Sequence, residues 1–261
     1  MSEPKRISIE GKDYFGWCYE EQTKIKHTIN HIHGCAHGCR YPCYAMSMAK
    51  RFGKARTYEE WCEPKLVGNA LELLDVEIPK LKDKINSVHL CFTSDPFMYG
   101  YDEVSEMSIA IIQKLNAAGI KCTVLTKGIL PVSLAELSPE NEYGITLVSL
   151  AEDFRKEMEP NTAPFIERIQ ALKALHAAGC KTWVSMEPYP TPNFIKQDLE
   201  VILDAISFCD KIIFGRLNYN KKVSEYKEYK QFFNSCAETV IAYCQKNNKD
   251  YHIKDGTISV V

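Results

Sequence analysis

Three cysteines share one short segment of the chain, GCAHGCRYPCYAM at positions 34–46: Cys35, Cys39 and Cys43. Their regular spacing would align them on one face of a helix. A helix is disfavoured because Gly34, Gly38 and Pro42 interrupt the segment, and inside a helix glycine costs about 1 kcal/mol and proline about 3 kcal/mol. The sequence therefore predicts a compact loop that directs three thiolates at one point.

Three convergent thiolates are soft ligands that suit zinc or an iron–sulfur cluster. A structural zinc site uses four protein ligands, commonly with a C-x2-C pair, and this sequence has no such pair. Zinc would need a fourth ligand from His31, His33, His37 or Cys18. A four-iron cluster bound by three cysteines instead leaves one iron open to a substrate or cofactor. We therefore favour a [4Fe–4S] cluster, with zinc and unligated thiols as the alternatives.

Short β-rich runs alternate with amphipathic helical stretches from residue 26 onward, the pattern of a parallel sheet wrapped by helices. The strands that we predict cover residues 26–32, 88–93, 121–126, 144–150, 182–186 and 211–214. The helices that we predict cover residues 44–52, 65–81, 103–118, 163–178, 196–208 and 224–246. This order predicts an α/β fold, either an open doubly wound sheet or a full or partial barrel.

In both architectures ligands bind at the carboxyl ends of the strands, so the residues that follow each strand are the candidates for chemistry. No linker rich in Gly, Ser or Pro divides the sequence. We therefore predict one domain over residues 1–261, with its core at about 26–214. Residues 215–261 are predicted to form a helical segment that covers the open side.

Composition narrows the class of protein further. The chain has 261 residues, 45% hydrophobic and 25% charged, and a formal charge of -2 that gives no bulk attraction to nucleic acid. No run reaches the roughly 18 apolar residues that span a bilayer, and the start does not look like a signal peptide. The eleven cysteines are odd in number, which argues against a disulfide framework. We expect a cytoplasmic protein with reduced thiols and no membrane partner.

Motifs at successive strand ends resemble those of the radical S-adenosylmethionine (SAM) superfamily, particularly its branch similar to spore photoproduct lyase. The branch has Cys-Tyr-Ala at the end of its cluster motif, matching residues 43–45, and a Thr-Ser-Asp-like motif, matching residues 93–95. Its third strand ends in Thr-Lys, matching residues 126–127. A Glu-Pro pair and F-x-E-R follow, matching residues 159–160 and 165–168. The usual cysteine motif is C-x3-C-x2-C, and the C-x3-C-x3-C of this sequence has one residue more in the second gap.

The resemblance spans roughly residues 26–214 and implies a partial (β/α)6 barrel that carries a [4Fe–4S] cluster and binds SAM. In the superfamily the open iron chelates the amino and carboxylate groups of SAM. Reductive cleavage then gives a 5′-deoxyadenosyl radical, which takes a hydrogen atom from the substrate. An external electron donor similar to flavodoxin or ferredoxin is a further implied partner. The alternatives are a zinc-stabilised binding protein without catalysis and a non-catalytic iron–sulfur redox protein.

Polar residues at or near the predicted strand ends are the candidates for SAM contacts. Lys127 and Arg168 are cations that can meet a carboxylate. Glu187 follows an apolar strand and can hold ribose hydroxyls or position substrate. The other candidates are short hydrogen-bonding groups and the tyrosine after the last cluster cysteine: Ser94, Asp95, Thr146 and Tyr44. Each of these residues also fits an ordinary structural role, such as a surface charge, a turn cap or a strand-end salt bridge.

Two observations bear on the substrate. Spore photoproduct lyase uses a cysteine directly before its Thr-Ser-Asp motif as a hydrogen donor, whereas this sequence has Phe92 there and Cys91 one residue earlier. Because side chains alternate along a strand, Cys91 is predicted to lie in the core, which argues against repair of spore photoproduct by the same route. Basic residues after the first cysteines make a nucleic acid or nucleotide one candidate substrate, beside the plainer interpretation of a solvated face: Arg40, Lys50, Arg51, Lys54 and Arg56.

Overall fold

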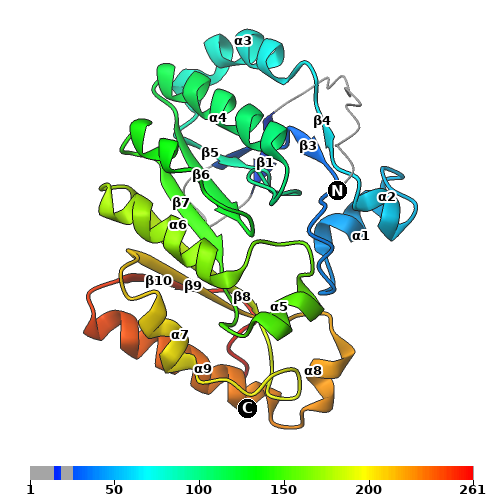
Figure 1. The fold of residues 1–261 in the computed structure, drawn as a ribbon, viewed down its shortest axis with the longest axis vertical. Helices are drawn as coiled ribbons and strands as arrows, with labels where there is room; N and C mark the ends of the chain where they lie inside the picture. Colours follow the sequence, from blue (N-terminus) through cyan, green and yellow to red (C-terminus); the bar gives the residue numbers. More distant parts are fainter. Residues whose placement is uncertain (1–14, 19–25, 261) are drawn as a thin grey trace.

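The computed structural model of the chain describes residues 15–18 and 26–260, and its main feature is an eight-stranded sheet (Figure 1). From β2 to β10 the neighbouring strands run parallel, while β1 is antiparallel to β2. The strands in sheet order are β1 (Phe15–Cys18), β2 (Lys26–Ile29), β5 (Ser87–Leu90), β6 (Lys121–Thr126), β7 (Glu142–Thr146), β8 (Lys181–Tyr189), β9 (Lys211–Arg216) and β10 (Asp250–Ile253).

Helices connect the parallel strands, because the end of one parallel strand lies far from the start of the next. From β5 onward each strand lies beside its predecessor, so the chain winds in one direction around the sheet. The helices are α1 (Tyr44–Arg51), α2 (Tyr58–Trp61), α3 (Ala70–Leu81), α4 (Asp102–Ala117), α5 (Glu152–Met158), α6 (Phe165–Ala177), α7 (Leu199–Ala205), α8 (Lys221–Glu225) and α9 (Tyr229–Lys246), with 3₁₀ turns η1 (Lys82–Lys84) and η2 (Val132–Glu136).

All six predicted strands are present, but α2 and α5 are additional helices and the helix predicted over 224–246 is divided into α8 and α9. Three further differences concern the strands and the segments beside them. The first strand ends at Ile29, and Ile32–His33 forms a separate strand, β3, that pairs with β4 (Lys65–Leu66). The helix predicted from residue 65 therefore begins only at Ala70. Part of the predicted covering segment is a seventh parallel strand, β10, which pairs with β9.

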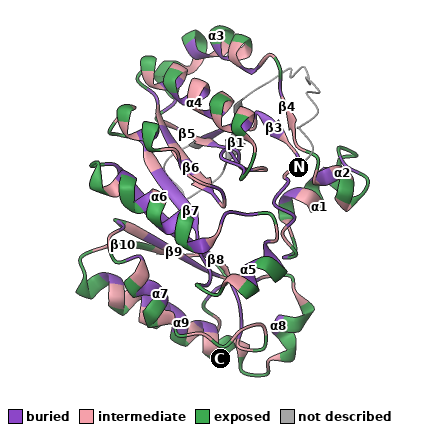
Figure 2. Cartoon of the chain, viewed as in Figure 1, coloured by how far each residue is buried: buried purple, intermediate pink, exposed green. Residues whose placement is uncertain are grey.

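Alternate residues of each strand face opposite sides of the sheet. On one side Val124, Ile145 and Met186 belong to the main hydrophobic core, where α4 packs on β6 and α6 on β7. Gly144 and Trp183 are register partners on the other side, and a Cβ on Gly144 would lie 2.3 Å from the Trp183 ring. Figure 2 shows the sheet as mostly buried and the outer surfaces of the helices as exposed.

None of the helices in the described part of the chain has both the length and the apolar composition needed to cross a bilayer. The first fourteen residues, on which the expectation about a signal peptide rests, lie outside the described residues.

Candidate active site

The cysteine loop runs from β3 to α1, beside the carboxyl ends of β2 and β5 (Figure 1). Gly34 and Gly38 have φ angles of 86° and 61°, in the left-handed region that favours glycine. The Cys35 N–H donates to the Trp61 carbonyl over 2.9 Å, and a Cβ on Gly34 would lie 2.7 Å from the same oxygen. The segment is a loop, as predicted, and the residues at the end of α2 fix its path.

The three motif thiols are partly buried and free of disulfide bonds. Burial raises the pKa of Cys35 well above its usual value, and the neighbouring Asp95 raises it further. Repulsion from Cys39 and Cys43 acts in the same direction. Burial also raises the pKa of Cys39 to about 12, although the Lys127 ammonium opposes this. Burial of Cys35 and Cys39 therefore disfavours their thiolates, and these two thiols and Cys43 are close enough to interact electrostatically.

This donor set fits a [4Fe–4S] cluster, because soft sulfur donors from one loop face a place where a metal group would supply the missing charge. Within the described residues, no three His, Cys, Asp or Glu side chains are already arranged around a metal position. His31 and His37, two candidates for a fourth zinc ligand, are buried against Ser108 and Asp95. The side chain of Cys18, another candidate, is outside the described part of the structure.

Asp95 ties the strand ends to the cysteine loop. Its Oδ1 accepts a hydrogen bond from the Thr126 hydroxyl at 2.6 Å, and its Oδ2 accepts one from the Lys127 N–H at 2.8 Å. His37 Nε2 accepts from the Tyr99 N–H at 3.2 Å, which assigns the ring proton to Nδ1, 3.4 Å from Asp95 Oδ2. Both carboxylate oxygens of this predicted SAM contact are therefore engaged with protein groups.

A buried ion triad forms the next layer of the site. Glu159 Oε1 binds Lys127 Nζ and Glu159 Oε2 binds Arg168 Nη2, both at 2.8 Å. Burial alone would raise the pKa of Glu159, but the two cations lower it to about 2. Glu159 and Arg168 have no exposed side-chain surface, whereas Lys127 keeps 17% of its side chain exposed. The triad therefore carries one net positive charge, and Lys127 is the member that reaches the surface.

Tyr41 connects this triad to the cysteine loop. It stands in the gap between Cys39 and Cys43, and its ring centre is 5.8 Å from Lys127 Nζ. The ring belongs to the main hydrophobic core, and its buried hydroxyl has no hydrogen-bond partner among the described residues. Of the three residues in the second gap of the cysteine motif, Tyr41 is thus turned into the core, while Arg40 and Pro42 are exposed.

Arg168 and Thr146, both predicted as SAM contacts, lie in the interior. Besides Glu159, Arg168 donates to the carbonyl groups of Thr146 and Ala163, each at 2.9 Å. Its guanidinium also donates to the Thr162 hydroxyl. In the sequence, Glu159 stands out only as part of the Glu-Pro motif. A signal for its role was available, because an acidic residue between two predicted cationic contacts is a natural partner for both.

Ser94 and Tyr44 make local contacts around the loop. The Ser94 hydroxyl donates to the Gly34 carbonyl, and the Tyr44 hydroxyl donates to the Phe92 carbonyl. The rings of Tyr44 and Phe92 have centres 5.5 Å apart. The structure therefore places Ser94 and Tyr44 at the loop, on either side of the predicted cluster ligands.

Glu187 lies near the carboxyl end of β8, across from Gly215 of β9. A Cβ on Gly215 would be 2.8 Å from the carboxyl carbon of Glu187, so the glycine leaves room for this side chain. β7 separates β8 from β6, the strand that precedes Lys127. The structure thus places Glu187 on the same edge of the sheet as the triad but outside it.

Cys91 lies in a small buried cluster with Ile32 and Met98. Its burial is as predicted, but strand alternation is not the reason, because β5 ends at Leu90 and Cys91 lies in the loop that follows. Its φ is 56°, and its Sγ lies 3.5 Å from His31 Nδ1. Phe92, which directly precedes the Thr-Ser-Asp motif, is exposed.

Comparisons with known proteins agree with these features. Residues 29–206 match the family described as the radical SAM superfamily. An uncharacterised protein of Acidianus two-tailed virus is 25% identical over 194 residues, which are 70% of this chain and 60% of that protein. The chain therefore spans only 60% of the length of this relative. An uncharacterised protein of Methanocaldococcus jannaschii is 26% identical over 214 residues, 79% of this chain and 77% of that protein.

Solved structures of spore photoproduct lyase share the fold. The enzyme complexed with dinucleoside spore photoproduct gives a TM-score of 0.61 at 15% identity, covering 87% of this chain and 75% of that chain. A mutant with bound AdoMet and dinucleoside spore photoproduct gives 0.59, with the same identity and coverage. This likeness confirms the predicted partial barrel, here extended by β10. Members of the matching family use a [4Fe–4S] cluster and SAM. The family match covers more than half of the residues of the chain, and the chain therefore belongs to the radical SAM superfamily.

Proposed function

We propose that the chain is a radical SAM enzyme in which Cys35, Cys39 and Cys43 hold the cluster and Lys127 binds the carboxylate of SAM. The observation that carries this proposal is the net positive triad beside the three thiols. An anion from solution can reach only its partly exposed member, Lys127, which also lies close enough to Cys39 to lower the pKa of that thiol. When bound, the cluster and SAM supply a 5′-deoxyadenosyl radical that removes a hydrogen atom from the substrate.

The other residues of the site position these groups or line the same edge of the sheet. Glu159 holds the Lys127 ammonium, and Arg168 anchors Glu159 from the interior. Asp95 and Ser94 fix the loop against β6 and the end of β5. We assign Glu187 and Tyr44 to ribose or substrate contacts, because Glu187 lies near the carboxyl end of β8 and Tyr44 begins α1 next to the last cluster cysteine. Thr146 ends β7 but is buried, and its carbonyl accepts from Arg168, so we assign it a positioning role.

Removal of one motif thiol tests the cluster assignment. Anaerobically purified Cys39→Ala is expected to lose the brown colour, the bound iron and the dithionite-dependent formation of 5′-deoxyadenosine from SAM. Cys62→Ala is the matched control, since Cys62 is also a partly buried thiol beside this loop but lies outside the motif. A colourless wild-type protein with bound zinc would refute the proposal, and so would a brown protein that never forms 5′-deoxyadenosine.

Replacement of Lys127 tests the assignment of SAM binding. Lys127→Met removes the charge and keeps the length of the side chain, so the dissociation constant for SAM is expected to rise about tenfold or more, as for loss of a charge-assisted hydrogen bond. Iron content is expected to stay unchanged. Equal SAM affinity in Lys127→Met and the wild type would remove Lys127 from the site.

The finer assignments concern substrate, partner and location. We propose a nucleic acid or nucleotide as substrate, on the support of the basic residues around α1, and a flavodoxin- or ferredoxin-like protein as electron donor. Repair of spore photoproduct is not part of the proposal, because Phe92 stands where that enzyme has its donor cysteine. Free thiols throughout the described residues support a cytoplasmic location.

A further inference from the structure

Helix α1 presents an unusual face to solvent directly after the last cluster cysteine. Ala45 and Ala49 are buried, while Tyr44, Met48 and Phe52 form an exposed stripe at helical spacing. Phe52 is 66% exposed. Phe92 from the loop after β5 extends this stripe through its contact with Tyr44. Four large apolar side chains therefore gather on one exposed surface beside the candidate active site, which marks an interaction surface.

Basic side chains lie on α1 and in the chain segments on either side of it. All five are exposed, and none of them forms an ion pair within the described part of the chain: Arg40, Lys50, Arg51, Lys54 and Arg56. The whole chain has a formal charge of -2, so this local concentration of positive charge is not a consequence of composition. Aromatic side chains next to a basic track are the chemistry that binds single-stranded nucleic acid, with bases on the rings and phosphates on the cations.

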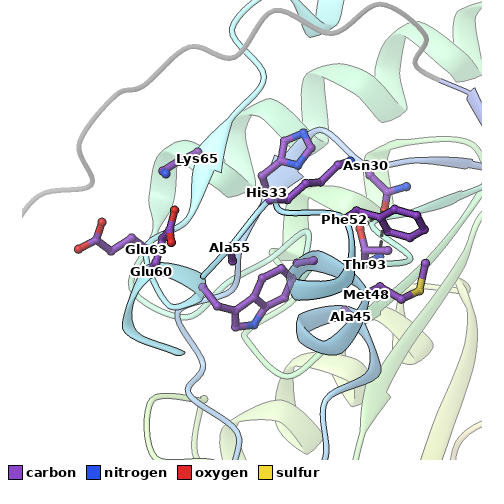
Figure 3. Close-up of a pocket in the computed structure, with 14 residues that line it drawn as sticks. Asn30, His33, Ala45, Met48, Phe52, Ala55, Glu60, Glu63, Lys65 and Thr93 are labelled. Atoms are coloured by element: carbon purple, nitrogen blue, oxygen red, sulfur yellow. Dashed lines mark hydrogen bonds between the residues drawn. The ribbon is translucent and has the colours of Figure 1, made fainter. Parts of the chain in front are cut away.

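A pocket of about 180 Å³ opens under the stripe (Figure 3). Phe52, Met48 and Thr93 lie at one end of it, and Lys65 and Glu63 lie at the other. This volume is well below the roughly 300–1,000 Å³ of sites that enclose a drug-sized ligand, so the pocket suits one ring system and not a whole nucleotide. The end of the pocket that Thr93 lines adjoins the active site, because Thr93 directly precedes Ser94 and Asp95.

We infer that α1 and this pocket bind a single-stranded nucleic acid, with one unpaired base in the pocket against Phe52 and the neighbouring phosphates on the basic residues. The inference rests on the proposed function and names the substrate that the site receives. In this arrangement the bound nucleic acid lies beside the cysteine loop.

The pocket lining favours a nucleobase over an apolar side chain of a partner protein. His33 lies in the wall, where its ring nitrogens can form hydrogen bonds with the edge of a base. Glu60 and Glu63 add carboxylate acceptors, which can receive the exocyclic amino groups of bases. Hydrogen-bonding groups beside an aromatic face match a flipped or unpaired base.

Fluorescence anisotropy with the cluster-loaded protein and labelled single-stranded oligonucleotides tests the inference without reductant or SAM. We expect the logarithm of the binding constant to fall with the logarithm of the salt concentration at a slope of about −3.5, as for about five phosphate contacts on a single strand. Phe52→Ala is expected to weaken binding about tenfold, as for one lost stacking contact. Ile166→Ala on α6 is the matched control, because Ile166 is a similarly exposed apolar residue away from α1, and its affinity is expected to equal that of the wild type.

An abasic oligonucleotide of the same length and charge separates base binding from charge attraction. We expect it to bind as weakly to the wild type as the ordinary oligonucleotide binds to Phe52→Ala. Equal binding of abasic and ordinary strands would overturn the inference, and so would an acidic ferredoxin that binds this surface while oligonucleotides do not. Failure of SAM cleavage with intact oligonucleotide binding would instead refute the proposed function and leave the surface assigned.

Discussion

The Glu159 carboxylate lies between two cations and has no exposed surface. Glu159→Gln keeps the shape of the side chain but leaves Lys127 and Arg168 without their counter-charge. Breaking a buried pair in this way costs about 3–5 kcal/mol, so we expect the free energy of unfolding in urea to fall by about that amount. Glu140→Gln, which removes a solvent-exposed partner of Lys181, is the control and is expected to change the free energy of unfolding far less. Equal effects of the two variants would show that the triad is not a stabilising unit.

Gly128 follows Lys127 at a point where the backbone leaves no space for a side chain. A Cβ on Gly128 would lie 1.7 Å from the Phe97 carbonyl oxygen, so the loop after β5 or the end of β6 must move. We expect Gly128→Ala to destabilise the protein by about 3 kcal/mol and to weaken SAM binding through the displaced Lys127. Gly53→Ala, with no atom within 4 Å of the new Cβ, is expected to cost only about 1 kcal/mol from its positive φ. Thermal unfolding of both variants measures the difference.

At the scale of elements, the pairing of β10 with β9 offers a test of the sheet topology, because it is the last parallel pairing in the strand order. The Asp250 N–H donates to the Asp210 carbonyl over 3.0 Å, whereas the next N–H along this edge strand, that of Tyr251, points away from β9. Asp250→Pro is expected to lower the melting temperature by about 3 °C, the effect of one lost hydrogen bond of about 1 kcal/mol in a chain of this size. Tyr251→Pro is expected to be better tolerated, since proline is accepted on the outer side of an edge strand. The reverse ranking would contradict the register.

The strands that sequence analysis found are those with apolar residues on the helix-packed face. Val124 and Val184 belong to such strands, and their regular burial produces the pattern from which a strand is predicted. β10 was missed because Asp250 and Tyr251 are exposed and His252 is polar, so this edge strand carries no apolar alternation. The sequence predicts a helix where β4 lies, because β4 forms by pairing with the distant segment β3 and the local sequence pattern carries no information about that pairing.

At the scale of the whole molecule, buried groups with lowered pKa values contribute to the response to acid, and His31 and Glu159 have the largest of these shifts. Burial lowers the pKa of His31 from 6.5 to about 3, so the unfolded chain takes up a proton below pH 6.5 that the folded chain refuses. Stability therefore falls as the pH drops through this window, by up to about 1.4 kcal/mol per unit. Glu159, with its pKa lowered from 4.5 to about 2, adds a further loss below pH 4.5 because only the unfolded chain protonates it there.

Urea midpoints measured from neutral pH down to pH 4.5 check this behaviour. We expect His31→Gln to flatten the decline that begins below pH 6.5, since it removes the group that the unfolded chain protonates. The flattening is partial, because burial also lowers the pKa of His37. An unchanged slope in His31→Gln would mean that His31 is protonated in the folded protein.

The candidate site could be predicted from the sequence only where its residues are neighbours in the chain. The cysteine spacing and the glycines around it were sufficient for the loop, because both act locally. The sequence alone does not distinguish the roles of Lys127 and Arg168. Lys127 is partly exposed and Arg168 is buried, and this difference arises only when β6, α5 and α6 pack together. Glu159, which joins them, is 32 residues from Lys127 in the chain.

Among the described residues, the strand order ends at β1 on one side and at β10 on the other, and these two edges do not pair. A closed barrel would admit a polymer only by threading its end or by extruding a single unit. If the proposed nucleic acid is the substrate, a barrel with one unjoined side can receive an internal nucleotide of a long strand, so neither a free end nor a break in that strand is required before reaction.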